Sequence, residues 1–198
     1  MHSFEQTADS TPLLTPALQA QLLTLARAAI DAGLNGGDPL RLKVEDYSPS
    51  LSEPAACFVT LTRNGALRGC IGTLEARESL VEAVAYYAYQ AAFGDPRFPV
   101  LEADELKLLR IEISVLGPQQ LLNVASEEQL LDLLRPGRDG LIIKEGALQA
   151  TFLPQVWEVL PNPQAFVRAL KCKAGLAPDY WSAETQCFRY QVESFSEP

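Results

Sequence analysis

Alternation of apolar and polar residues predicts a β-hairpin in the first half of the chain. Residues 55–63 and 66–72 both read as strands, and Asn64-Gly65 lies between them. Both turn residues tolerate a positive φ, so this dipeptide is the strongest short-range hairpin signal. Antiparallel strands joined by a two-residue turn are therefore expected here.

The expected hairpin register brings two chemically active side chains together. With a two-residue turn, Leu61 opposes Arg68 and Val59 opposes Cys70, unless a glycine bulge intervenes. Alternation then places Arg68 and Cys70 on one face, about 7 Å apart along the strand.

Further strands are expected where the same pattern recurs. A half-buried strand is predicted at 108–116, where Ile111 and Ile113 alternate with polar residues. Glu145-Gly146 marks a second hairpin, and the last strand should follow after the next helix. The remaining strands are predicted at residues 140–144, 147–153 and 186–195.

Helices are expected where capping signals precede apolar stretches. Thr15-Pro16 should cap a helix over 17–32 that stops at Gly33, and Ser79 with Glu82 forms a capping box. The other helices are expected at 80–93, from 127 to near Pro136, and from Pro163 to about 174. Hairpin, helix and strand thus recur in each half, which favours an α+β fold with a mixed or antiparallel sheet over a Rossmann layout.

Length and composition indicate one globular domain. The chain has 198 residues, of which 47% are hydrophobic and 21% are charged, enough for one substantial core. The expected organisation is a flexible segment at 1–14, a single domain at 15–195 and a tail at 196–198.

Net charge and hydropathy exclude several functions. A net charge of -9 and a pI near 4.7 oppose nucleic-acid binding, because such binding depends on cations that displace phosphate counterions. No apolar run reaches the roughly 20 residues that span a bilayer, and the N-terminus lacks a secretion signal. A cytoplasmic protein without membrane association is expected.

Cysteine and histidine content limits the available chemistry. The four cysteines are widely separated, so neither a disulfide framework nor a CxxC metal site is expected. His2 is the only histidine and stands in a terminus expected to fray, so a catalytic triad and histidine-based zinc sites lack their imidazole. We expect no bound metal and no cofactor.

The hexapeptide 67–72, Leu-Arg-Gly-Cys-Ile-Gly, is the segment most typical of a functional site. Glycine weakens a strand because it packs no side chain, so Gly69 and Gly72 indicate a bulge or a close backbone approach. They are candidate ligand-binding positions beside the Cys70 thiol.

The hexapeptide resembles the signature of the AMMECR domain family, named for the Alport syndrome, midface hypoplasia and elliptocytosis candidate region. The resemblance extends in order over most of residues 15–195 and includes these further segments: Cys57-Phe58-Val59-Thr60-Leu61, Asp95-Pro96-Arg97-Phe98-Pro99, 110–116, 140–143, 151–156 and 173–176. The chain departs from the family pattern at 157–163 and around Lys171-Cys172.

The family resemblance implies a fold and a set of partners. The fold would contain two β3α2-type repeats around a mostly antiparallel, barrel-like sheet with flanking helices, arranged as a larger and a smaller lobe. The family has no established reaction. Its prokaryotic members are associated with a Memo-family protein and a radical-SAM protein, so the chain resembles one component of such a system.

Cys70 is the first candidate site residue, as a thiolate nucleophile or redox centre. A nearby Arg68 would favour the thiolate, although a free cysteine is also a common small core residue. Arg68 could instead bind an anionic ligand, or pair with Glu75 or Glu112.

The remaining site candidates lie on a loop and a strand. Asp95 and Arg97 follow a helix and could line a cleft with the hairpin, or form an ion pair that fixes the loop. Glu112 is a weaker catalytic candidate, because a carboxylate in the middle of a strand usually faces water.

Three hypotheses follow for function. The chain could bind a small anionic ligand or a partner protein at a cleft between 68–70 and 95–98, as a component of the Memo and radical-SAM system. It could instead be an enzyme in which Cys70 attacks the substrate, Arg68 holds an anionic group, and Glu112 or Asp95 moves protons. In the third hypothesis Cys70 belongs to the core of a structural or oligomerisation module.

Overall fold

The computed structural model describes residues 14–36 and 39–198. The chain divides into two compact units. Unit 1 comprises the described residues up to Ile113 together with Phe195–Pro198, and unit 2 comprises Ser114–Ser194. Most of the segment expected to be flexible, residues 1–14, lies outside the described residues, and Leu14 is buried.

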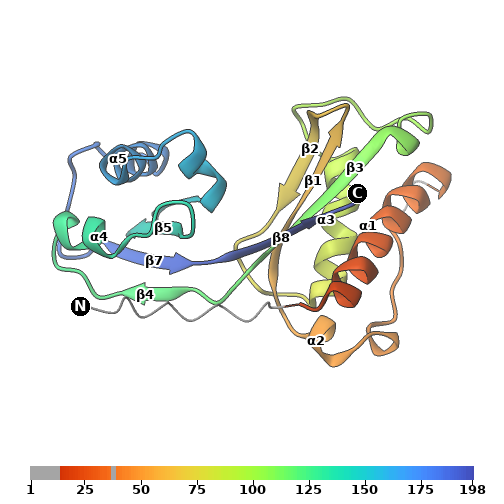
Figure 1. Cartoon of the computed structure of the whole chain (residues 1–198), viewed down its shortest axis with the longest axis horizontal. Helices are drawn as coiled ribbons and strands as arrows, with labels where there is room; N and C mark the ends of the chain where they lie inside the picture. The colour runs from red at the N-terminus through yellow and green to blue at the C-terminus, as the bar shows by residue number, and fades with distance from the viewer. Residues whose placement is uncertain (1–13, 37–38) are drawn as a thin grey trace, which may run out of the picture. The chain divides into compact units, whose positions relative to one another are not determined.

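Each unit has helices and a sheet of its own (Figure 1). Unit 1 contains α1 (Pro16–Gly36), η1 (Val44–Asp46), α2 (Pro49–Ser52), β1 (Ala56–Arg63), β2 (Ala66–Gly72), α3 (Leu80–Phe93) and η2 (Leu106–Leu108). Unit 2 contains β4 (Gln120–Leu122), α4 (Glu127–Leu133), β5 (Gly140–Glu145), β6 (Leu148–Phe152), η3 (Pro154–Glu158), α5 (Pro163–Lys173) and β7 (Gln186–Tyr190). Strands β3 (Leu109–Leu116) and β8 (Val192–Ser196) run across the division.

The strands form two four-stranded sheets. Their orders are β2-β1-β3-β8 and β4-β7-β5-β6. The predicted α+β class with mostly antiparallel strands is confirmed, and the described strands form two open sheets in place of a closed barrel. β2 and β8 are the edge strands of the first sheet.

The first hairpin forms where the sequence predicts it, but its register differs. Asn64 and Gly65 both adopt positive φ, at 53° and 79°. Leu61 pairs with Gly69, not Arg68, and Cys70 pairs with Thr60.

A bulge causes this difference. The register shifts between Leu61 and Thr62, whose partners are Gly69 and Leu67, so Arg68 is the extra residue on β2. A bulged residue has no direct partner and interrupts strict alternation. The argument that placed Arg68 and Cys70 on one face therefore does not hold.

Helix α1 continues beyond its predicted stop. Thr15 accepts a hydrogen bond from the backbone N–H of Leu18 at 3.4 Å, and Pro16 occupies the first turn as expected. Gly33 is buried inside the helix, because a Cβ there would collide with the Tyr89 and Phe93 rings of α3. This glycine allows two helices to pack closely and does not end α1.

The core of unit 1 lies between α1, α3 and one face of the sheet (Figure 1). Side chains at alternate positions of β1 and β3 are fully buried on this face: Cys57, Val59, Leu61, Ile111 and Ile113. The capping box of α3 is present, with Ser79 accepting from the Glu82 backbone and Glu82 accepting from the Ser79 backbone. In β1 and β3, the residues that alternate with these buried core residues face away from α1 and α3.

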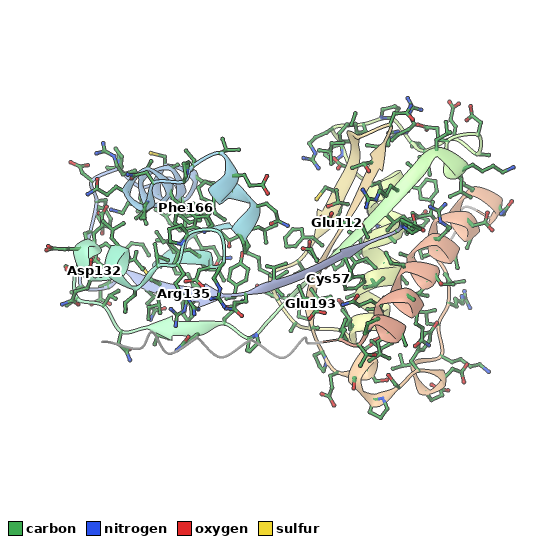
Figure 2. All side chains as sticks on the ribbon, viewed as in Figure 1. Cys57, Glu112, Asp132, Arg135, Phe166 and Glu193 are labelled. Atoms are coloured by element: carbon green, nitrogen blue, oxygen red, sulfur yellow. The ribbon has the colours of Figure 1, made fainter. Side chains whose placement is uncertain are left out.

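Unit 2 packs its core around two stacked rings. Trp157 and Phe166 lie parallel, with ring centroids 3.7 Å apart, and the Trp157 indole donates to the Asp139 carbonyl at 2.7 Å. Phe166 is labelled on α5 in Figure 2. Segment 157–163, which departs from the family pattern, thus begins with a core residue.

The final predicted strand is two strands that belong to different sheets. Residues 186–190 form β7, which pairs with β4 and β5, whereas residues 192–196 form β8 in the first sheet. The break falls at Gln191, whose carbonyl accepts from the Gly117 backbone at 2.9 Å. Apolar and polar residues alternate from one strand into the next, so the sequence pattern gives no sign of the change of sheet.

The C-terminus is held by an ion pair. Glu197 accepts from Arg27 Nε and Nη2 at 2.7 and 2.6 Å, and from the Ile111 backbone N–H at 2.9 Å. Arg27 also donates to the carbonyls of Leu106 and Leu109. Residues past 195 therefore join α1 to the edge of the sheet.

The Gly69→Ala substitution should destabilise the protein by on the order of 3 kcal/mol. A Cβ at Gly69 would collide with the Ala91 carbonyl oxygen of α3, a backbone atom that cannot move away alone. Urea unfolding measures the change in free energy. Gly36→Ala is the matched control, because a Cβ there meets nothing within 4 Å, and its effect should stay within about 0.5 kcal/mol. Equal stability of the two variants would contradict the close approach.

Candidate functional site at Cys70

The backbone of Cys70 is held from the open side of β2. Its N–H donates to Asp95 Oδ2 at 2.9 Å, and its carbonyl accepts from Arg97 Nη2 at 3.0 Å. Both groups therefore point away from β1. The predicted approach of the 95–99 loop to residues 69–72 is confirmed.

Asp95 and Arg97 also bind each other. Arg97 Nε lies 2.9 Å from Asp95 Oδ1, and Arg97 Nη2 lies 2.7 Å from Asp95 Oδ2. The Arg97 backbone N–H also donates to Oδ1 at 3.1 Å. The Asp95 side chain is 1% exposed, whereas that of Arg97 is 54% exposed. We call this ion pair and its two bonds to Cys70 the Asp95–Arg97 clamp.

The hydrogen bonds of the clamp make Asp95 a poor proton carrier. The hydrogen bonds from Arg97 hold the pKa of Asp95 well below its usual range, and the Cys70 backbone N–H adds to this effect against the opposing effect of burial. A carboxylate is ordinarily ionised near neutral pH, and a pKa lowered further makes Asp95 a weaker base. Asp95 therefore positions Cys70.

The Cys70 thiol is half-buried and has polar neighbours. Thr60 Oγ1 donates to Cys70 Sγ at 3.3 Å across the strand pair. The pKa of Arg97 is raised mainly by its hydrogen bond to Asp95, and the nearby Cys70 side chain contributes in the same direction. Arg97 is therefore the cation next to this thiol, a role that the sequence suggested for Arg68.

The other cysteines lie in different environments. Cys57 and Cys187 are fully buried, and burial raises the pKa of each thiol to about 12. Cys172 is exposed near the end of α5. Only Cys70 combines partial exposure with a hydroxyl donor and an adjacent guanidinium among the described residues.

Arg68 forms a buried ion pair with a residue that sequence reasoning missed. Its Nε and Nη2 donate to the two carboxylate oxygens of Glu105 at 2.9 and 2.8 Å, and both side chains are 9% exposed. The partner is neither Glu75 nor Glu112. Because this bidentate pair satisfies the guanidinium internally, Arg68 is poorly suited to bind an anionic ligand.

Glu105 is the centre of a small charged network. It also pairs with Arg63 and accepts from the Glu102 backbone N–H at 3.0 Å. The hydrogen bonds from Arg68 are the largest of several causes that lower the pKa of Glu105 to about 2. The network ties the bulge on β2 to the segment that precedes β3.

The two glycines of the hexapeptide serve backbone packing. Gly69 faces the Ala91 carbonyl of α3, and a Cβ on Gly72 would collide with the Cys57 carbonyl and the Phe58 ring. The bulge and close approach expected from these glycines are thus present. A ligand role for Gly69 and Gly72 stays a prediction.

Glu112 lies in the middle of β3 (Figure 2). Glu112 is half-buried, and its side chain forms no hydrogen bond or ion pair with any other described residue. Ile111 and Ile113 on either side face the helices, so Glu112 projects from the other face of the sheet. It does not pair with Arg68.

Metal ligands do not gather in the part of the chain described. Within residues 14–36 and 39–198, no three His, Cys, Asp or Glu side chains come together as a metal ion would require. No helix of this part is long and apolar enough to cross a membrane.

Known proteins share both the sequence and the fold. Residues 23–195 match the AMMECR1 family. A protein of Methanothermobacter thermautotrophicus is 38% identical over 182 residues, which cover 89% of this chain and 92% of that protein. A protein of Methanocaldococcus jannaschii is 37% identical over 180 residues, which cover 87% of this chain and 86% of that protein.

A solved structure has the same architecture. The crystal structure of an uncharacterised protein from Pyrococcus horikoshii superimposes with a TM-score of 0.84 at 35% identity, covering 93% of this chain and 94% of that one. The fold is therefore that of a known class of α+β proteins. The chain belongs to the AMMECR1 family, as its sequence motifs suggested.

Removing the Glu105 charge should destabilise the protein in a pH-dependent way. At pH 7, Glu105→Gln leaves Arg68 buried without a counter-ion, which should cost about 3 kcal/mol. The pKa of Glu105 is about 2 in the folded protein and 4.5 as the ordinary value. Its contribution is therefore complete above pH 4.5 and is lost as the pH falls towards 2.

Urea unfolding between pH 2 and pH 7 tests this expectation. The difference between wild type and Glu105→Gln should shrink as the pH falls. Arg63→Met is the control, because the Arg63 side chain is 44% exposed and its loss should cost under about 1 kcal/mol. A difference that stays constant across this range would contradict the charge account.

Proposed function

We propose that this protein is a ligand-binding accessory protein whose site consists of the Cys70 thiol and the exposed part of the Arg97 guanidinium. The observation that carries the proposal is the Asp95–Arg97 clamp, which fixes Cys70 through its backbone and leaves its half-buried thiol beside Thr60. A rigid backbone under a reactive side chain is typical of a site built on the strands of a rigid scaffold.

A small anionic ligand fits this site best. Arg97 uses Nε and Nη2 for Asp95 and Cys70, while Nη1 has no partner among the described residues. With about half of the side chain exposed, this edge can donate to a carboxylate or a phosphate. Arg68 is excluded from this role because Glu105 occupies it.

A thiol enzyme is the second candidate. It is favoured by the half-buried Cys70 thiol, which accepts a hydrogen bond from Thr60 and lies beside the Arg97 guanidinium. Asp95 is already bonded to Arg97 and to the Cys70 backbone N–H, so Glu112 is the candidate base in this scheme. The hypothesis of a purely structural cysteine suits Cys57 and Cys187 better, because both are fully buried.

The family resemblance supplies the setting for the proposal. We place the protein in the cytoplasm, with a Memo-family protein and a radical-SAM protein as partners. The anionic ligand would then pass to or from the chemistry of those proteins.

Alkylation of Cys70 by iodoacetate should depend on Arg97. Loss of the adjacent cation in Arg97→Met should slow the reaction several-fold near neutral pH, because the guanidinium no longer attracts the carboxylate of the reagent to the thiol. Peptide mass mapping measures the rate at Cys70, with exposed Cys172 as the internal reference. Because Arg97 also belongs to the clamp, circular dichroism and thermal unfolding must first show that the variant is folded.

Arg77→Met is the matched control, because this arginine is 77% exposed and pairs only with Glu75 among the described residues. It should leave the Cys70 rate unchanged. A Cys70 that reacts only after global unfolding, or at one rate in wild type and Arg97→Met, would overturn the proposed site.

Partner binding gives an independent test. Purified Memo-family and radical-SAM proteins from the same genome should bind the wild-type chain in isothermal titration calorimetry, and binding should weaken at least several-fold in Cys70→Ser or Arg97→Met. No binding by the wild-type chain would contradict the assignment of these partners. Equal binding by both variants would place the interface away from Cys70.

A further inference from the structure

The open face of the first sheet carries polar residues that line up across all four strands. The β1–β2 register pairs Cys70 with Thr60. Thr62 Oγ1 donates to the Arg110 carbonyl at 3.4 Å, which places Arg110 beside Thr62 on the neighbouring antiparallel strand. The strands are antiparallel, so Glu112, two residues after Arg110, lies beside Thr60, two residues before Thr62.

The fourth strand continues the alignment. Glu197 N–H donates to the Ile111 carbonyl, and the hydroxyls of Ser114 and Ser194 lie 2.8 Å apart. These two contacts set the β3–β8 register and place Ser196 opposite Glu112. We call Cys70, Thr60, Glu112 and Ser196 the polar row.

The polar row lies on the face turned away from α1 and α3. Its neighbours in sequence, such as Val59, Leu61 and Ile113, are fully buried against the helices, and residues of a strand alternate between faces. Thr60, Cys70, Glu112 and Ser196 are each partly exposed. The row therefore borders the proposed site directly, with Arg97 at its β2 end.

Glu112 is the charged member of the row whose charge is not neutralised. Its nearest cation on the same face, Arg110, donates to the Glu197 carbonyl at 2.7 Å and to Ser196 Oγ at 2.8 Å. Arg110 is thereby held towards the C-terminal segment. Glu112 has no such partner within the described residues.

The site thus has opposite charges at its two ends. Arg97 offers a cationic edge at β2, Glu112 offers a carboxylate at β3, and the Cys70 thiol and Thr60 hydroxyl lie between them. Neighbouring strands are about 4.8 Å apart, and Arg97 lies outside β2 on the outward Cys70 carbonyl, so Arg97 and Glu112 are about three strand spacings, or roughly 15 Å, apart. A single anionic group contacts only one end of this row.

We infer that the ligand is a short zwitterionic peptide, with its carboxylate at Arg97 and its protonated amine at Glu112. This inference rests on the proposed function. A hydrogen bond of about 2.8 Å at each end leaves roughly 10 Å of this distance for the ligand. An extended chain spans about 3.3–3.6 Å per residue, so three residues fill that length. The hydroxyl and thiol in the middle of the row suit the amide groups of such a chain.

Triglycine and its blocked forms test the inference. In titrations of the ¹⁵N-labelled protein followed by NMR, triglycine should shift the Cys70, Thr60 and Glu112 amides. It should bind about tenfold more tightly than N-acetyl-triglycine, which lacks the amine, and than triglycine amide, which lacks the carboxylate. Diglycine, which is too short, should bind more weakly than triglycine.

Two variants assign each end of the peptide. Glu112→Gln should abolish the preference for triglycine over its N-acetyl form, and Arg97→Met should abolish the preference over the amide. Glu128→Gln, an exposed change on α4 in unit 2, should leave both preferences unchanged.

Acetate, titrated alone, separates this inference from the proposed function. Acetate binding that disappears in Arg97→Met, without any preference for triglycine over its N-acetyl form, would leave the anion site standing and overturn the peptide ligand. Failure of both acetate and triglycine to bind would overturn both proposals.

Discussion

The Asp95–Arg97 ion pair satisfies the outward backbone groups of Cys70 at the edge of the first sheet. β2 is an edge strand, so the outward N–H and C=O of Cys70 lack a neighbouring strand. Unpaired edge groups invite association with other chains, and proteins cover them in several ways. Here a carboxylate accepts the N–H and a guanidinium donates to the carbonyl. One ion pair thus replaces one residue of a missing strand.

This arrangement explains why the thiol can be both fixed and accessible. The backbone of Cys70 is held by β1 through the residues around it and by the 95–99 loop from the open side. Its side chain points to the face of the sheet opposite α1 and α3, where Thr60 is its neighbour. Rigidity comes from the backbone contacts, and the chemistry is left to the side chain.

The sequence suggested Arg68 as the cation beside the Cys70 thiol, but in the structure Arg97 has this position and Arg68 has a structural role. Arg68 stands in the hexapeptide with Cys70, so spacing alone made it the natural activator of the thiol. The bulge takes Arg68 out of the alternation, and Glu105 neutralises it. Arg97, 27 positions beyond Cys70, supplies the cation. A bulge cannot be located from alternation alone, and the Arg68–Glu105 pairing depends on a long-range contact that no local pattern records.

The sequence predicts those parts of the structure that local rules control. The Asn64-Gly65 turn, the Ser79 capping box and the helix start at Pro163 all appear as expected, because each depends on residues within four positions of one another. The end of α1, the exchange of sheets at Gln191 and the role of Glu105 do not follow from such rules. For the site, Cys70, Asp95 and Arg97 could be proposed from the sequence, whereas Thr60 required the observed register.

Hydrogen exchange at the Cys70 amide tests the central claim most directly. In the wild-type protein this amide should be protected, because it donates to Asp95. In Asp95→Asn, which keeps the shape of the side chain but weakens the acceptor and its pairing with Arg97, exchange at Cys70 should accelerate at least about tenfold. Under the same conditions the Leu61 amide inside the hairpin should change little. Equal protection of the Cys70 amide in the two proteins would show that the Asp95–Arg97 clamp does not hold β2.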